Sequence, residues 1–289
     1  MAIRKKIELG ISTCPNDTFA FHGLMTGKVD DQGLQFQVAL TDVQDLNDEL
    51  FAGQYDVAKA SFHAALRLAE ETLVLPSGSA LGFENGPLLL SRHTDLHPSE
   101  LVDGGLPIVL CPGATTTATL LYQMFYQGKG DVQQVVFSEI MPALRESRAD
   151  FGVCIHEGRF TWQDQGLTCL ADLGELWHSE TRQPLPLGGI LARRHLGEDV
   201  LGKVQQVVHD SILYGLNHPE EALETMRQYA AEMDDEVLMA HVDLYVNDET
   251  LFLGKAGREA LAAWSEKAIQ LNSPASAEFH RLGGFGDEA

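Results

Sequence analysis

Short apolar or alternating runs follow one another along the chain, separated by amphipathic stretches, which is the pattern of strands alternating with helices. Predicted strands, each bounded by turn residues, cover residues 7–11, 34–40, 55–60, 87–91, 107–111, 133–137, 150–155 and 185–192. Predicted helices cover residues 17–25, 43–52, 115–126, 140–148, 198–216, 219–231, 235–246 and 255–271. This order predicts an α/β fold. The tail from Asn272 onwards contains Ser, Pro and Gly and is expected to be poorly ordered.

Two stretches of the chain repeat the same order of predicted elements: strand, polar loop, helix, strand, helix and strand. The loop reads CPNDT in the first stretch and CPGATTT in the second, and the last strands lie in GQYDVAKAS and SRADFGVCIHE. Two such units, joined by extended crossings, predict two lobes around a central cleft, whereas a single continuous sheet is the alternative. We expect a discontinuous large lobe at 1–94 and 190–289 and a small lobe at 95–189.

The composition narrows the classes of partner. The chain has 289 residues, enough for two cores, and 44% of them are hydrophobic. Its 42 acidic and 20 basic side chains give a net charge of −22, which repels nucleic acid and anionic membranes. A site for a small anionic substrate must therefore supply its own positive potential. The composition does not indicate an oligomeric state.

The sequence is expected to carry neither a targeting segment nor a cofactor motif. No stretch reaches the ~18 apolar residues of a membrane span, and no secretory apolar run follows the basic N-terminus, so we expect a cytoplasmic protein. The four cysteines form no CxxC pair, which disfavours a zinc site or a disulfide framework. The patterns GxGxxG after a strand, GxxxxGK[ST], GxSxG and HExxH do not occur, so neither a metal nor a nucleotide cofactor has support.

Polar residues gather where predicted strands end, which is where ligands of α/β folds bind. Four segments have this position: 12–18, 59–63, 112–118 and 156–161. Segment 112–118 reads PGATTTA and opens a helix, whose N–H groups and dipole favour a carboxylate. The alternative is that one threonine merely caps the helix. The candidate ligands here are Thr115, Thr116, Thr117 and Ala118.

The first two segments carry further candidates. Thr13 and Asn16 follow the strand at 7–11, next to Asp17, for which a helix cap is an adequate explanation. Lys59 lies on an apolar strand, where an amine is costly unless it reaches water or a partner. It is either a cation that faces the cleft or a side chain that extends to solvent.

His156 directly follows the apolar strand FGVCI and is the candidate general base. Histidine titrates near neutrality, and the end of a strand in a predicted cleft favours function over a structural role. Glu157 either orients the imidazole or points away, and Arg159 either binds a substrate carboxylate or pairs with Glu157. His22 and His63 are secondary candidates.

Several stretches occur together in the order known from one enzyme family. They are CPNDTF at 14–19, KAS at 59–61, IHEGRFT at 155–161, LPLGGILAR at 185–193 and the helix start HPEEAL at 218–223. Through them the chain resembles the 1,4-dihydroxy-6-naphthoate synthases of the futalosine route to menaquinone, over nearly its whole length. The resemblance implies a two-lobed fold of the type II periplasmic-binding-protein kind, with mixed sheets flanked by helices.

The resemblance also implies a carbon–carbon lyase that converts cyclic dehypoxanthine futalosine to 1,4-dihydroxy-6-naphthoate without a cofactor. The catalytic base of the family falls on His156, and its substrate-binding stretches fall on Lys59, Ala60 and Ser61 and on Thr116, Thr117 and Ala118. Donors from Ser61, Thr13 or Asn16 are expected to hold a developing enolate oxygen. The alternatives are a cytoplasmic binding protein for a small carboxylate and a sibling enzyme of the chorismate dehydratase type.

Overall fold

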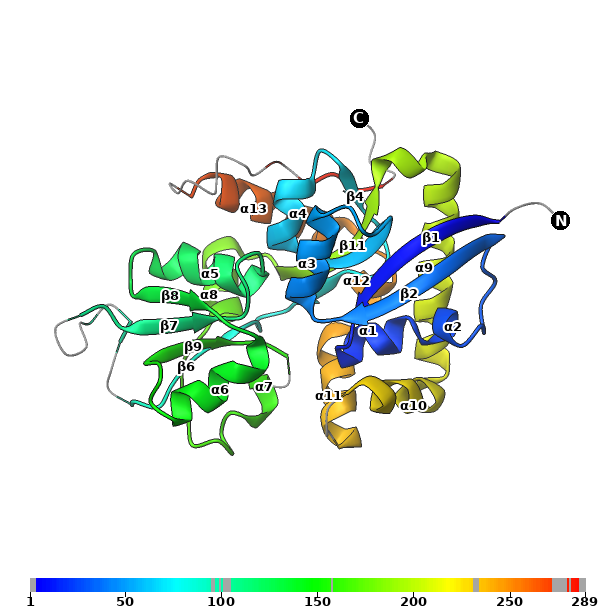
Figure 1. The fold of residues 1–289 in the computed structure, drawn as a ribbon. Helices are drawn as coiled ribbons and strands as arrows, with labels where there is room; N and C mark the ends of the chain where they lie inside the picture. Colours follow the sequence, from blue (N-terminus) through cyan, green and yellow to red (C-terminus); the bar gives the residue numbers. More distant parts are fainter. Residues whose placement is uncertain are drawn as a thin grey trace. The chain divides into compact units, whose positions relative to one another are not determined.

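The structure, a computed structural model, describes residues 4–94, 97, 98, 100, 105–156, 158–230, 234–271, 280 and 282–285. The chain divides into two compact units (Figure 1): unit 1 comprises Met1–Leu81 and Pro186–Ala289, and unit 2 comprises Gly82–Leu185. Strand β6 (Leu88–Ser91) pairs within unit 2, whereas the predicted boundary after residue 94 placed it in the other lobe.

Unit 1 contains a mixed sheet with the strand order β2-β1-β3-β11-β4, and β5 pairs with β11. Strand β1 is parallel to both β2 and β3, so the carboxyl ends of these three strands lie at one edge of the sheet. Strand β11 is antiparallel to β3 and β4. The strands are β1 (Lys5–Ser12), β2 (Leu34–Thr41), β3 (Val57–Ser61), β4 (Thr72–Val74), β5 (Ala80–Gly82) and β11 (Leu185–Arg193).

Both faces of the sheet in unit 1 are covered by helices. Apolar residues of α9 recur every three or four positions and join Ile7, Leu9 and Ile11 of β1 in one core. Helix α3 approaches β1 closely at Gly10, where a Cβ atom would lie 2.8 Å from Leu46. The helices of unit 1 are α1 (Pro15–Ala20), α2 (His22–Met25), α3 (Val43–Phe51), α4 (Phe62–Leu68), α9 (Glu198–Asn217), α10 (Pro219–Tyr229), α11 (Asp235–Tyr245), α12 (Asp248–Leu251) and α13 (Lys255–Ile269), with a 3₁₀ turn at Arg194–Leu196.

Unit 2 contains a second mixed sheet with the strand order β10-β6-β9-β7-β8. Strand β7 is parallel to β8 and β9, while β6 is antiparallel to β9 and β10. The order β8-β7-β9-β6 thus repeats the order β2-β1-β3-β11 of unit 1, in agreement with the repeat seen in the sequence. The strands are β6, β7 (Ile108–Cys111), β8 (Asp131–Gln134), β9 (Phe151–Cys154) and β10 (Thr168–Asp172).

The core of unit 2 joins its strands to helix α6. Leu88, Leu90 and Leu110 pack with Ile140 and Leu144 of this helix. At Gly152 a Cβ atom would lie 2.4 Å from Ile140 Cγ2, so the glycine permits the close contact between β9 and the helix. The helices of unit 2 are α5 (Thr117–Tyr126), α6 (Phe137–Arg145), α7 (Gly158–Thr161) and α8 (Leu173–Thr181).

Some predicted elements were wrong in extent. The helix expected at 17–25 is two short helices, and the strand expected at 133–137 is β8, which ends at Gln134 before α6 begins at Phe137. The sequence analysis did not predict the strands β4, β5 and β10 or the helices α4, α7, α8 and α12. Most of the tail expected to be poorly ordered lies outside the described residues. Of its described part, Gly283 and Phe285 are held by β4, because Val74 N donates to Gly283 O (2.9 Å) and Phe285 N donates to Val74 O (2.9 Å).

Candidate active site

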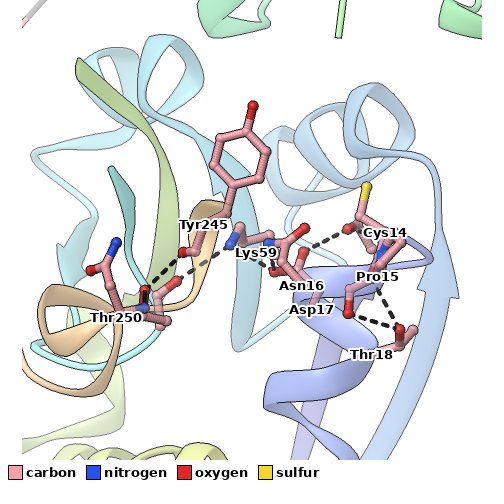
Figure 2. Close-up of polar contacts among 11 residues, drawn as sticks. Cys14, Pro15, Asn16, Asp17, Thr18, Lys59, Tyr245 and Thr250 are labelled. Atoms are coloured by element: carbon pink, nitrogen blue, oxygen red, sulfur yellow. Dashed lines mark hydrogen bonds and ion pairs between the residues drawn. The ribbon is translucent and has the colours of Figure 1, made fainter. Parts of the chain in front are cut away.

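A buried polar cluster lies at the carboxyl ends of β1 and β3 in unit 1 (Figure 2). Lys59 Nζ of β3 donates to Asp17 Oδ1 of α1 at 2.7 Å, and the two side chains are 8% and 4% exposed. The Ser12 hydroxyl donates to Asp17 Oδ2 (2.5 Å), and the Asn16 amide donates to Asp17 Oδ1 (3.0 Å). We call Ser12, Asn16, Asp17 and Lys59 the lysine cluster. It brings together Asn16 and Lys59, two of the predicted binding residues.

The lysine cluster shows how the fold accommodates a cation on an apolar strand. The Lys59 amine also donates to Gly78 O (3.3 Å), so it neither extends to solvent nor stands as an isolated cation. Asp17 was expected only to cap a helix, and its role as the partner of Lys59 was missed. The sequence contained evidence for this ion pair, because a lysine on an apolar strand requires a partner and Asp17 follows the neighbouring parallel strand.

The remaining predicted residues of unit 1 lie at the same strand ends. Ser61 is buried, its amide donates to Asn47 Oδ1 (3.0 Å) and its hydroxyl accepts from Asn47 Nδ2 (3.2 Å). Ala60 is buried on β3, and Thr13 is half-buried just after β1. Asn47 of α3 therefore orients Ser61, a contact that no sequence motif indicated.

In unit 2 the candidate base and the threonine segment follow the carboxyl ends of the neighbouring strands β9 and β7. These strands are parallel neighbours, with Val109 opposite Phe151 and Leu110 opposite Gly152. The residues that follow them, 112–116 after β7 and 155–156 after β9, therefore leave the same edge of the sheet. This places His156 outside the hydrophobic core and at the same end of the sheet as residues 115–118.

His156 has an unusual backbone conformation. Its φ is +54°, in the left-handed region that is uncommon for residues other than glycine. The ring is half-buried and meets Phe137 of α6 edge-on, with 4.9 Å between ring centroids. Strained backbone at a strand end supports a functional role for this histidine. Glu157, expected either to orient the imidazole or to point away, lies outside the described residues.

The threonine segment combines a helix cap with a possible ligand site. Thr116 is the N-cap of α5, and its hydroxyl accepts from Thr119 N (3.3 Å) and donates to Gly113 O (2.8 Å). Capping is thus the observed role of this hydroxyl. Thr115, Thr117 and Ala118 are buried around the helix start. The N–H groups of this first turn carry the partial positive charge that a carboxylate requires.

Arg159 of α7 forms an ion pair with Asp172, at the end of β10. Its Nη1 lies 2.6 Å from Asp172 Oδ2 and donates to Gly86 O at 2.7 Å. The Asp172 carboxylate also caps α8 by accepting from Gly174 N (2.8 Å). The sequence analysis did not single out Asp172, although Asp172-Leu-Gly-Glu175 has the spacing of a helix-capping motif.

The two secondary histidine candidates are buried in unit 1. His22 Nδ1 lies 2.7 Å from the Thr225 hydroxyl, and burial lowers the pKa of this imidazole. His63 is buried in α4. His63 lies two residues after the end of β3, within segment 59–63, whereas His22 lies in α2, away from the strand ends. Within the described part of the chain, His, Cys, Asp and Glu side chains form no group of three or more that could hold a metal ion. Among the described helices, none combines the length and apolarity needed to cross a membrane.

The fold and the strand-end polar residues define a class of protein. Two mixed α/β sheets with the same strand order are the architecture of periplasmic-binding-protein-like proteins. A Candida albicans protein described as having the generic periplasmic binding protein fold matches with a TM-score of 0.63 at 11% identity, over 98% of each chain. The chain belongs to the menaquinone-biosynthesis family, whose model matches residues 7–270.

Curated relatives agree with this assignment. A 1,4-dihydroxy-6-naphthoate synthase of Thermus thermophilus is 40% identical over 256 residues, which cover 89% of this chain and 91% of the relative. A synthase of the same name from Streptomyces coelicolor is 37% identical over 260 residues, covering 88% and 90%. The solved structure of protein AF1704 from Archaeoglobus fulgidus matches with a TM-score of 0.84 at 29% identity, over 91% of this chain and 96% of that chain.

Proposed function

We propose that this protein is a 1,4-dihydroxy-6-naphthoate synthase, a carbon–carbon lyase that acts on cyclic dehypoxanthine futalosine. The observation that carries the proposal is the 40% identity to the Thermus thermophilus synthase along 89% of the chain. The position of His156 just beyond the carboxyl end of β9, beside the parallel strand β7, agrees with it. A small anionic substrate fits this assignment, because the helix start at residues 115–118 supplies positive potential in a chain with a net charge of −22.

We infer that His156 is the general base of the reaction. It accepts a proton from the cyclic carbon skeleton, and the electron pair of that bond forms the new double bond of the ring as the carbon–carbon bond to the sugar portion breaks. The electron pair of the broken carbon–carbon bond leaves with the sugar-derived fragment, which takes the proton back from the His156 imidazolium. The new aromatic ring makes this step favourable. The left-handed backbone of His156 and its edge contact with Phe137 hold the imidazole in one orientation, as proton transfer requires.

The substrate-binding residues are part of the same proposal. The substrate carboxylate binds at the start of α5, through Thr115, Thr117, Ala118 and the amides around the Thr116 cap. In unit 1, Thr13, Asn16, Lys59, Ala60 and Ser61 stay predicted substrate ligands, as does Arg159 in unit 2. The absence of a cofactor and the cytoplasmic location also stay predictions.

The proposed activity is tested by mass spectrometry of the reaction products. Purified protein incubated with the cyclic precursor should form 1,4-dihydroxy-6-naphthoate, whereas chorismate should not be consumed. His156→Asn and His156→Ala should lower turnover by about 10²–10⁴-fold, the usual contribution of a general base. The exposed His195 offers a matched control, and His195→Asn should keep wild-type turnover.

Two results would count against these assignments. A wild-type protein that binds the precursor but forms no naphthoate would be a binding protein and not a synthase. Consumption of chorismate would point to the sibling dehydratase class. If both His156 variants keep wild-type turnover while the wild type makes naphthoate, the activity stands and another residue is the base.

A further inference from the structure

The turn that carries His156 is short. His156 lies two residues after β9, and the helix that follows, α7, has only four residues. Its backbone is tied by Gly158 N donating to Ile155 O and by Arg159 N donating to His156 O, both at 3.2 Å. A single helical turn is unstable by itself, and a left-handed residue persists only where its surroundings impose that conformation. Some tertiary contact must therefore hold this turn in place.

The Arg159 side chain supplies such a contact. Its Nη1 reaches both Asp172 Oδ2 (2.6 Å) and Gly86 O (2.7 Å). The ion pair is largely withdrawn from water, since the Arg159 and Asp172 side chains are 20% and 8% exposed. A hydrogen bond between charged groups at this depth is stronger and more directional than one on the surface. Arg159 thus ties the turn after His156 to two other segments of unit 2.

These two anchoring segments are themselves packed tightly together. Asp172 Oδ1 accepts from Gly174 N (2.8 Å), which fixes the carboxylate at the start of α8. Leu173 N donates to Pro87 O (2.9 Å), and a Cβ atom on Gly174 would lie 2.2 Å from Asn85 O. The carboxylate that receives Arg159 is therefore held by rigid parts of the unit.

We propose that Asp172 is a positioning residue, which holds Arg159 and thereby fixes the turn that presents His156. This inference rests on the proposed function, because it assigns His156 the role of general base. Arg159 is also a predicted substrate ligand, and the present inference assigns it a positioning role in place of direct binding of the substrate. Rate should then depend on the ion pair through the placement of the imidazole, while substrate affinity should depend on it little.

The substitution Asp172→Asn separates the two roles of this carboxylate. Asparagine caps helices about as well as aspartate, so α8 should be preserved, while the charge that holds Arg159 is lost. We expect kcat to fall about 10- to 100-fold, the effect of a small misplacement of a catalytic group. KM should change little, because ground-state binding is not removed. Asp234, the N-cap of α11, provides the matched control, and Asp234→Asn should behave as wild type.

A double-variant cycle tests whether the two side chains act as a unit. Arg159→Gln should lower kcat about as much as Asp172→Asn, and the double variant should be no slower than either single variant. Arg159→Lys should have a higher kcat than Arg159→Gln, because lysine again gives the Asp172 carboxylate a positively charged partner. A rise in KM with unchanged kcat in Arg159→Gln, together with wild-type kinetics in Asp172→Asn, would make Arg159 a substrate ligand and overturn the proposal.

A readout without turnover keeps this inference separate from the proposed function. In protein with isotope-labelled histidine, the ring signals of His156 are assigned by their loss in His156→Asn. Those signals should shift in Asp172→Asn and stay in place in Asp234→Asn. Unshifted signals would overturn the positioning role even if naphthoate is formed. Shifted signals in a protein that forms no naphthoate would support the positioning role and reject the synthase assignment.

Discussion

At the scale of single residues, the buried ammonium group of Lys59 is paired with the carboxylate of Asp17. The ion pair is neutral overall, and hydrogen bonds from Ser12 and Asn16 complete the shell of the carboxylate. An anion near the lysine cluster would therefore be attracted by N–H and O–H dipoles more than by net charge. Such a pair need not stabilise the fold much, but removing one partner leaves the other charge buried and uncompensated.

We therefore predict that Lys59→Met destabilises the protein by about 3–5 kcal/mol, because the Asp17 carboxylate loses its cation. Urea unfolding followed by circular dichroism measures the change. The double variant Lys59→Met/Asp17→Asn should recover part of this loss, since no charge remains buried. A double variant whose destabilisation equals the sum of the two single variants would show that the two charges are not coupled.

Two buried thiols should make the free energy of unfolding decrease with rising pH in the alkaline range. Burial raises the pKa of Cys111 and of Cys154 from 9.0 to about 12. Above a pH of about 9 the thiols ionise in the unfolded chain but stay protonated in the folded one. The stability that they contribute is therefore complete below about pH 9 and is lost as the pH rises toward about 12.

Cys111→Ala and Cys154→Ala should each make this alkaline loss less steep. One such group changes the free energy of unfolding by up to about 1.4 kcal/mol per pH unit. Urea unfolding at a series of pH values between about 8 and about 10 measures the slope. Slopes identical to that of the wild type in both variants would contradict the effect of burial on these thiols.

At the scale of elements, glycines decide how closely helices approach the sheets. Gly152 lets Ile140 of α6 contact the backbone of β9, whereas Gly202 in α9 has no atom within 4 Å of the position that a Cβ would occupy. The two residues are identical in type and opposite in environment. One is required by packing, and the other only weakens a helix.

We expect Gly152→Ala to destabilise the protein by about 1–3 kcal/mol, because the added methyl group overpacks the core of unit 2. Gly202→Ala should instead stabilise it by about 0.5–1 kcal/mol through better helix propensity. Thermal unfolding of both variants and the wild type makes the comparison. If both substitutions shift the midpoint in the same direction, the packing argument at Gly152 fails.

At the scale of the whole molecule, each unit has its own sheet and its own core. Unit 2 is continuous in sequence, and the strands β6 to β10 that the structure describes in it pair with one another. Its core lies between these strands and α6. A segment with its own core and satisfied strand pairing has the properties of an independently folding domain.

The fragment Gly82–Leu185 should therefore fold when it is expressed alone. We expect a single cooperative urea transition by circular dichroism, because the apolar residues that stabilise it are buried within the fragment. Introducing Gly152→Ala into the fragment should lower the urea concentration at its transition midpoint. This effect would show that the native core is what unfolds in the transition. A gradual, non-cooperative loss of signal would show that unit 2 depends on the rest of the chain.

Much of this fold could be predicted because its strands are buried and its helices amphipathic. The long helix α9 was predicted at 198–216 and spans Glu198–Asn217, since its apolar residues recur with helical spacing. Short elements were harder to predict from the sequence. The half-buried strand β10 lacks a clear alternation, and β8 is mostly exposed, so its bounds were misjudged. Elements as short as α7 leave almost no periodic signal.

The sequence by itself determined the α/β class, the repeated order of elements, the family and the choice of His156, because periodicity and local motifs are properties of neighbouring residues. Only the tertiary structure decided which distant side chains meet. The pairs Lys59–Asp17 and Arg159–Asp172 each join a residue of a strand to a residue of a helix. Such contacts depend on strand order and helix placement, and these follow from packing of the whole unit and not from local sequence.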